Sequence, residues 1–106
     1  MDKNLKEELD IIKEGILKTV PTVAIYLFGS CANGTYNEDS DIDIYVVVPD
    51  IDIDLVNLRS DIRMNLRNKK SMPMDLLVGK ASVFNRRKQG LTLESVIARD
   101  GVLLYG

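Results

Sequence analysis

The sequence predicts a small domain of the α/β (α+β) class, in which strands and helices alternate along the chain. Three observations lead to this fold class. Apolar residues recur with helical spacing in several segments, short continuous apolar runs lie between them, and the two kinds of segment alternate along the chain. The chain has 106 residues, of which 45% are hydrophobic and 28% charged, so we expect one compact domain over residues 1–106.

The two longest helices are predicted from stripes of apolar residues spaced by three and four. The first runs from about residue 2 to residue 18 and is terminated by Pro21. The second ends near Asn68, with Asp52 or Asp54 as its N-cap. The two stripes consist of Leu5, Leu9, Ile12, Ile16 and Val20, and of Leu55, Leu58, Ile62 and Leu66.

Four short strands are predicted between the helical segments. Apolar runs bounded by proline, glycine or polar loop residues are typical of strands buried in a sheet. The predicted strands comprise residues 23–28, 41–48, 74–78 and 102–105. Residues 33–40 are rich in small polar residues and should form a loop. Shorter helical segments are expected at residues 81–88 and around 93–97, with Gly101 placed to stop the second.

Composition argues against several classes of function. A net charge of -2 and an isoelectric point near 5.1 are unlike a general nucleic-acid binder, so nucleic acid is not expected as a direct partner. No apolar run approaches the roughly 20 residues of a membrane span, and the charged N-terminus lacks the apolar core of a signal peptide. The single cysteine, Cys31, cannot form an internal disulfide, which fits a cytoplasmic location.

The absence of histidine restricts the metal chemistry. No imidazole can act as a general base or as a zinc ligand, and one cysteine cannot complete a structural zinc site. Any bound metal must therefore be held by oxygen atoms, which are the ligands that Mg²⁺ and Mn²⁺ prefer.

Two aspartates at the start of a predicted strand are the leading candidates for metal binding. Asp41 and Asp43 are two residues apart, so their side chains would point to the same face of the strand, about 6.6 Å apart along it. Such carboxylates can converge on two metal ions about 3.5–4 Å apart. Asp75, at the start of another apolar strand, is the candidate third ligand. The alternatives are a solvent-facing strand end for the pair and a structural ion pair with an arginine for Asp75.

A Gly-Ser turn directly follows the first predicted strand. Gly29 lets the backbone approach a ligand closely. Ser30 offers a hydroxyl group and, if a helical turn begins there, backbone amides that favour phosphate. The alternative is an ordinary turn with a helix cap. With the paired aspartates, the turn favours a metal-dependent phosphoryl-type reaction.

Together these residues resemble the nucleotidyltransferase superfamily that includes DNA polymerase beta, and most of all its minimal nucleotidyltransferases. The family pattern is Gly-Ser, a short spacer, an Asp-x-Asp pair and a third acid on a later strand. The residues that match it are Gly29, Ser30, Asp41, Asp43 and Asp75, with Ala32 and Gly34 as small residues of the spacer. Residues 101–105 also resemble the close of minimal members, so the resemblance covers nearly the whole chain.

The resemblance implies the nucleotidyltransferase fold, which is a small mixed β-sheet with helices packed mainly on one face, and a two-metal reaction. Asp41, Asp43 and Asp75 would bind two Mg²⁺ or Mn²⁺ ions, which hold the triphosphate of ATP or another NTP. Asp75 would also take the proton of an acceptor hydroxyl, which attacks the α-phosphate as pyrophosphate leaves. Gly29 and Ser30 would hold the β- and γ-phosphates, and Ser40 of the same motif is grouped with them as nucleotide-binding.

The resemblance also implies a protein partner. Small family members are often paired with a helical HEPN-type protein in a toxin–antitoxin module, in which the nucleotidyltransferase is the antitoxin and a partner tyrosine is one implied acceptor. Many members carry arginine directly after Gly-Ser and two positions later, where this chain has Cys31 and Asn33. Two alternatives stay open: a catalytically weak or inactive binding module of the same fold, and a small-molecule nucleotidyltransferase that acts as a homodimer.

Two further charge patterns are interpreted as structural. Residues 50–54 also alternate acidic and apolar side chains, but they follow a proline and precede a helix, so we expect helix capping rather than metal binding. Arg59, Arg63 and Arg67 line one face of the second long helix. A solvated face is the default interpretation, with a partner or RNA surface as the alternative.

Overall fold

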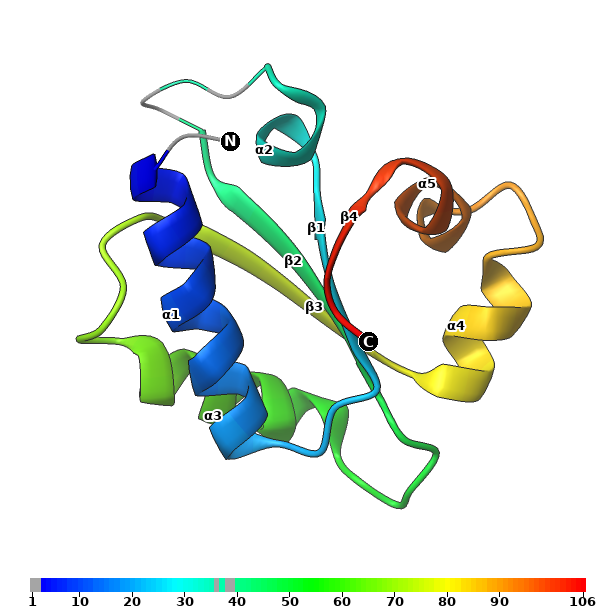
Figure 1. Ribbon diagram of the computed structural model, residues 1–106. Coiled ribbons are helices and arrows are strands. Elements are labelled where there is room, and N and C mark those ends of the chain that lie inside the picture. Colours follow the sequence, from blue (N-terminus) through cyan, green and yellow to red (C-terminus); the bar gives the residue numbers. More distant parts are fainter. Residues whose placement is uncertain (1–2, 36, 38–39) are drawn as a thin grey trace.

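A computed structural model describes residues 3–35, 37 and 40–106 of the protein. Its four-stranded sheet has the strand order β3-β2-β1-β4 (Figure 1). The strands are β1 (Ala24–Phe28), β2 (Ile42–Val48), β3 (Met74–Lys80) and β4 (Val102–Tyr105). The helices are α1 (Lys3–Thr19), α2 (Ser30–Asn33), α3 (Leu55–Leu66), α4 (Ala81–Arg87) and α5 (Leu93–Asp100). β2 and β3 are parallel, whereas β1 is antiparallel to both β2 and β4, so the predicted mixed sheet is confirmed.

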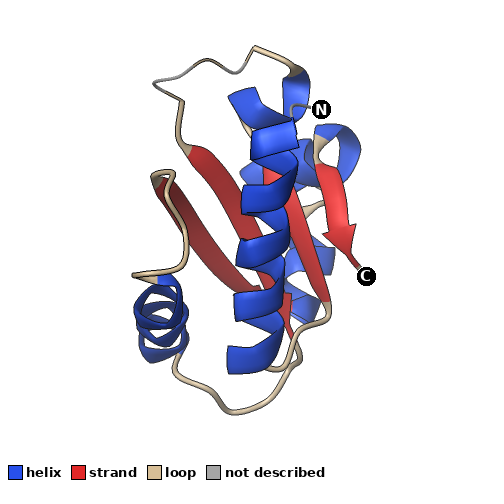
Figure 2. Ribbon diagram, turned by 60° about the vertical axis from the view of Figure 1, so that its left-hand side comes forward, coloured by secondary structure: helices blue, strands red, loops and turns tan. Residues whose placement is uncertain are grey.

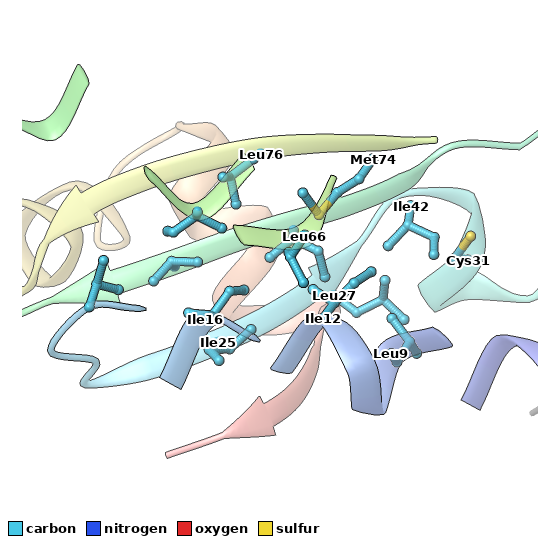
Figure 3. Packing of buried hydrophobic residues seen from close by; sticks show 14 of the residues in the cluster. Leu9, Ile12, Ile16, Ile25, Leu27, Cys31, Ile42, Leu66, Met74 and Leu76 are labelled. Carbon is cyan, nitrogen blue, oxygen red and sulfur yellow. The ribbon is translucent and has the colours of Figure 1, made fainter. Parts of the chain in front are cut away.

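The main core lies between one face of the sheet and the two longest helices, α1 and α3. In Figure 2, α1 runs across this face. Side chains from the helical stripes pack against alternate residues of β1 and β2, as the close view in Figure 3 shows. The fully buried members include Ile12, Ile16, Ile25, Leu27, Ile42, Ile44, Ile62 and Leu66. Gly15 allows α1 to approach α3, because a Cβ atom there would overlap the side chain of Leu66.

A smaller cluster lies on the opposite face, under α4 and α5 (Figure 1). Tyr45 and Val47 of β2 pack there with Phe84 of α4 and Ile97 of α5. The Phe84 ring lies 5.3 Å from that of Tyr45 and stacks at 5.4 Å on that of Tyr26. The two longest helices thus share one face, as expected, and two short helices cover part of the other.

The acidic segment before α3 caps helices, as the sequence indicated. Asp54 is the N-cap of α3, where its side chain accepts hydrogen bonds from the backbone N–H groups of Val56 and Asn57. Asp50 accepts a hydrogen bond at 2.9 Å from the N–H of Ser82 in the first turn of α4. This contact joins the β2–α3 loop to α4 on the other side of the sheet.

The outer surface of α3 is polar. Arg59, Arg63 and Arg67 are all exposed, in agreement with the solvated face that their spacing predicts. Within the described residues, no helix is both long enough and apolar enough to cross a membrane.

We expect Ile12→Ala to lower the free energy of unfolding by about 2–5 kcal/mol, because it leaves a cavity in the main core. Ile11→Ala is the matched control, since Ile11 is the preceding residue of α1 and its side chain is 38% exposed. It should cost well under half as much. Urea unfolding followed by circular dichroism measures both changes, and equal losses would contradict this assignment of the core face.

Candidate active site

Three strand ends meet at one end of the sheet. β1 ends there and both β2 and β3 begin there, because β1 is antiparallel to β2 and β2 is parallel to β3 (Figure 1). Asp43 is the cross-strand partner of Phe28 on one side and of Asp75 on the other. Such partners are about 5 Å apart and point to the same face. The three side chains therefore form one line across the sheet, which we call the Phe28–Asp43–Asp75 row.

The row lies on the face that carries α4 and α5, beyond the part that these helices cover. Tyr45, two residues after Asp43, points to the same face and packs against Phe84 of α4. Asp43 itself is only partly buried, and Asp75 is exposed. A ligand can therefore reach both carboxylates from the solvent.

Gly29 is required at this position for two reasons. Its backbone has φ 72° and ψ -155°, a conformation that is essentially restricted to glycine. In addition, a Cβ atom on Gly29 would collide with the Oδ2 atom of Asp43. The glycine that precedes Ser30 thus leaves room for the central carboxylate of the row, which connects the two parts of the sequence motif.

The short helix α2 begins at Ser30 and connects the Gly-Ser turn to the start of β2. Its second residue, Cys31, is buried, and the thiol donates a hydrogen bond at 3.4 Å to the backbone carbonyl of Asp41. Burial and the nearby charge of Asp43 raise the pKa of the Cys31 thiol, so it stays neutral at physiological pH. Gly34 ends α2 in the left-handed conformation, with φ 84°.

The spacer between the turn and β2 lies partly outside the described residues. Ser40, grouped with the nucleotide-binding residues from the sequence, contacts the spacer itself. Its hydroxyl accepts a hydrogen bond at 3.0 Å from the N–H of Asn37, and its own N–H donates to the Asn37 carbonyl at 3.1 Å. These bonds join Asn37 to the residue immediately before Asp41.

A buried glutamate holds the loop that leads to Asp75. Glu8 of α1 is only 6% exposed, and it accepts hydrogen bonds from the N–H of Ser71 at 2.6 Å and from the N–H of Met72 at 2.9 Å. The next residue, Pro73, accepts a bond at 2.9 Å from the N–H of Ile42. Sequence reasoning missed Glu8, although its position next to Leu9 on the apolar side of α1 was a signal of burial.

The carboxylates of the site repel one another. Burial raises the pKa of Asp43, and the charges of Asp75 and Asp41 raise it further, together with a hydrogen bond between the Asp43 and Asp75 carboxyl groups. The site therefore holds more negative charge than its surroundings compensate. A proton or a bound cation relieves this repulsion.

The fit of these residues to a divalent metal rests on their donor atoms. Asp43 and Asp75 provide converging carboxylate oxygens, which suit Mg²⁺. Asp41 is exposed and lies just before β2, near enough for its charge to act on Asp43. In residues 3–35, 37 and 40–106, however, no three Asp, Glu, Cys or His side chains are close enough together to form a metal site. The structure thus brings two of the three predicted acids together.

A second network, centred on a buried glutamate, connects α4 and α5 to β2 beside the row. Glu94 of α5 is 8% exposed, and its Oε2 accepts a 3.3 Å hydrogen bond from the Tyr45 hydroxyl. Its Oε1 lies 3.1 Å from Nε of Arg87 on α4. Burial and the Glu94 charge raise the pKa of Tyr45 to about 12. Burial opposes the ionisation of Glu94, but hydrogen bonds, including those from Arg87 and Tyr45, lower its pKa overall.

We expect Asp43→Asn to raise the melting temperature at pH 7 to 8 in the presence of EDTA. Folding raises the pKa of Asp43, so the protein loses stability as the pH increases from the unfolded pKa of about 3.9 through the higher folded pKa. Asparagine does not ionise, so the variant avoids this loss. The gain should therefore shrink as the pH falls toward 4. Asp61→Asn, on the exposed surface of α3, is the matched control for the removal of one negative charge. Thermal unfolding across this pH range tests the sign.

Comparison with known proteins relates this geometry to a family. Residues 9–99 match the nucleotidyltransferase domain family. The "Putative protein adenylyltransferase MJ0604" of Methanocaldococcus jannaschii is 32% identical over 104 residues, which cover 98% of this chain and 97% of that protein.

Solved structures share the fold at lower identity. A toxin–antitoxin crystallised with AMP-PNP has a TM-score of 0.59 at 23% identity, over 92% of this chain and 72% of that one. A protein described as a "putative nucleotidyltransferase from Sulfolobus solfataricus" has a TM-score of 0.57 at 22% identity, over 99% and 88% of the two chains. A mutant of the toxin–antitoxin MntA–HpeT has a TM-score of 0.61 at 22% identity, over 93% and 72%. The protein belongs to the nucleotidyltransferase domain family, as its Gly-Ser turn and spaced aspartates implied.

Proposed function

We propose that this protein transfers AMP from ATP to a hydroxyl group of a partner protein. The observation that carries the proposal is the Phe28–Asp43–Asp75 row, in which two carboxylates converge next to the glycine of the Gly-Ser turn. Two comparisons support adenylyl transfer in particular. The relative from M. jannaschii is named as a protein adenylyltransferase, and one structural neighbour was crystallised with the nucleotide AMP-PNP.

We assign each residue the role that the family resemblance implies for it. Asp43 and Asp75, with Asp41 as the third ligand, would hold Mg²⁺, which would supply positive charge to the triphosphate and to the reacting oxygens. Gly29 and Ser30 bind the β- and γ-phosphates through the turn. The acceptor oxygen bonds to the α-phosphorus as the bond to pyrophosphate breaks. Asp75, whose carboxylate is exposed to solvent, takes the acceptor's proton.

The acceptor side of the site is open to a second chain. Asp41 and Asp75 are both exposed, so no described side chain covers them. We propose that a helical HEPN-type partner covers this side and presents a tyrosine hydroxyl, and that the protein acts as the antitoxin of the pair. Support comes from the two structural neighbours that are described as toxin–antitoxin structures.

A second function is favoured by one observation. Cys31 is buried and neutral at the position where many family members carry arginine. Its thiol donates a hydrogen bond to the backbone carbonyl of Asp41. The triphosphate would therefore lack one of its usual cationic partners. A protein with so little positive charge there could bind and neutralise its partner without chemistry.

Incubation with α-labelled ATP, Mg²⁺ and the product of the neighbouring gene separates the two functions. We expect the parent protein to label the partner, and Asp43→Asn to reduce the label at least about 100-fold, because it removes the central carboxylate of the site. Asp61→Asn on α3 is the matched control and should retain full activity. EDTA should abolish labelling by the parent.

Three other outcomes would each contradict a different part of this proposal. If Asp43→Asn labels as well as the parent, the site assignment is wrong. If calorimetry detects no binding at millimolar ATP and Mg²⁺ while the partner still binds, the protein is a binding module. If a small molecule is labelled instead of a protein, the homodimeric small-molecule enzyme gains support.

A further inference from the structure

A pocket of about 370 Å³ lies between α2 and α5, directly beside the candidate active site. Four apolar side chains line it: Phe28 of β1, Ala32 of α2, and Leu93 and Val96 of α5. Asn33 and Asp100 add polar groups, and Gly29 contributes backbone. We call it the α2–α5 pocket. Its volume falls within the roughly 300–1,000 Å³ that is typical of small-molecule sites.

The pocket is continuous with the catalytic row through two residues. Phe28 is a member of the row and lines the pocket, and Gly29 lies against the carboxylate of Asp43. Two larger hollows, of about 410 and 490 Å³, lie along α1, and none of their lining residues belongs to the site. Location therefore favours the α2–α5 pocket as the place where part of a bound nucleotide rests.

The chemistry of the pocket suits a flat ring with a polar edge. Leu93 and Val96 are 44% and 45% exposed, so a ligand in the pocket would remove apolar surface from water. The side chain of Asn33 is held in place by Thr35, whose N–H and hydroxyl donate hydrogen bonds to its Oδ1 atom. Asp100 is held by Arg99, whose Nη2 donates at 2.9 Å. An amide and a carboxylate at the rim can meet both donors and acceptors on a heterocycle.

We propose that the α2–α5 pocket binds the nucleobase of the NTP, an inference that rests on the proposed function. A nucleotide with its α-phosphate beside Asp43 needs a place for its base within the length of one ribose. The cross-strand distance from Asp43 to Phe28, about 5 Å, is within that reach. An aromatic side chain of the acceptor is the competing occupant, and the experiment below distinguishes it.

Calorimetric titration with Mg-ATP and with Mg-tripolyphosphate separates base binding from phosphate binding. The parent should bind ATP more tightly than tripolyphosphate. Val96→Gln should weaken ATP binding about tenfold while leaving tripolyphosphate binding within twofold, because it changes the apolar wall without changing the charge. Val56→Gln is the matched control, since Val56 is 66% exposed on α3, and it should change neither affinity.

Leu93→Ala provides a second variant of the pocket, and unchanged circular dichroism spectra verify the fold of each protein. Equal affinity of the parent for ATP and tripolyphosphate would overturn the inference and leave the phosphate site intact. Unchanged affinity for ATP in both pocket variants would also overturn the inference. If the variants instead raise only the KM for the protein acceptor in the labelling reaction, the pocket binds the acceptor and the inference is wrong. If the parent binds neither compound, the proposed function fails and the inference fails with it.

Discussion

The placement of the Asp43 carboxylate is the constraint on which the candidate site depends. Gly29 leaves room for it, Phe28 borders it on one strand and Asp75 on the other. Because β1 runs against β2 while β3 runs with it, a strand that ends and two strands that begin can meet at one point. The mixed sheet therefore explains why Gly29, Asp43 and Asp75, which are spread over residues 29–75 of the sequence, lie close together.

Polar groups in the surrounding structure hold this arrangement in place. Glu8 fixes the loop before Asp75, and Cys31 fixes the backbone at Asp41. Both groups are buried, and burying a polar group is favourable only when its hydrogen bonds are made. Carboxylates that repel one another need such support, because their own interaction would push the strand ends apart. Glu8, which lies outside the sequence motif, and Cys31, which lies in its spacer, thus both support the site.

Local sequence patterns predicted the strands and the long helices, since each depends on neighbouring residues, whereas the mixed sheet was predicted from the family resemblance. The sequence did not decide between Asp52 and Asp54 as the N-cap of α3, and it did not show why α5 ends at Gly101. Both answers required the backbone conformation. A Cβ atom on Gly101 would lie 2.5 Å from the Ile97 carbonyl oxygen, so a lack of space, and not a positive φ, requires glycine there. The contacts of Glu8 with Ser71 and of Glu94 with Tyr45 join residues that are distant in the sequence, and no periodicity reveals them. The metal role of Asp41, Asp43 and Asp75 stays a prediction.

The missing arginines and the α2–α5 pocket bear on the same problem of nucleotide affinity. At position 31 a charged side chain would have to be buried, and at position 33 the asparagine faces the pocket. In the proposed mechanism, phosphate recognition then depends on the Gly-Ser backbone and on metal ions held by the acids. A site with fewer cations gains less from the triphosphate, so contacts to the base must supply a larger share of the binding free energy. The departure from the family pattern and the apolar pocket beside it therefore fit a single change in nucleotide binding. Ion pairs with the triphosphate contribute less, and contacts with the base contribute more.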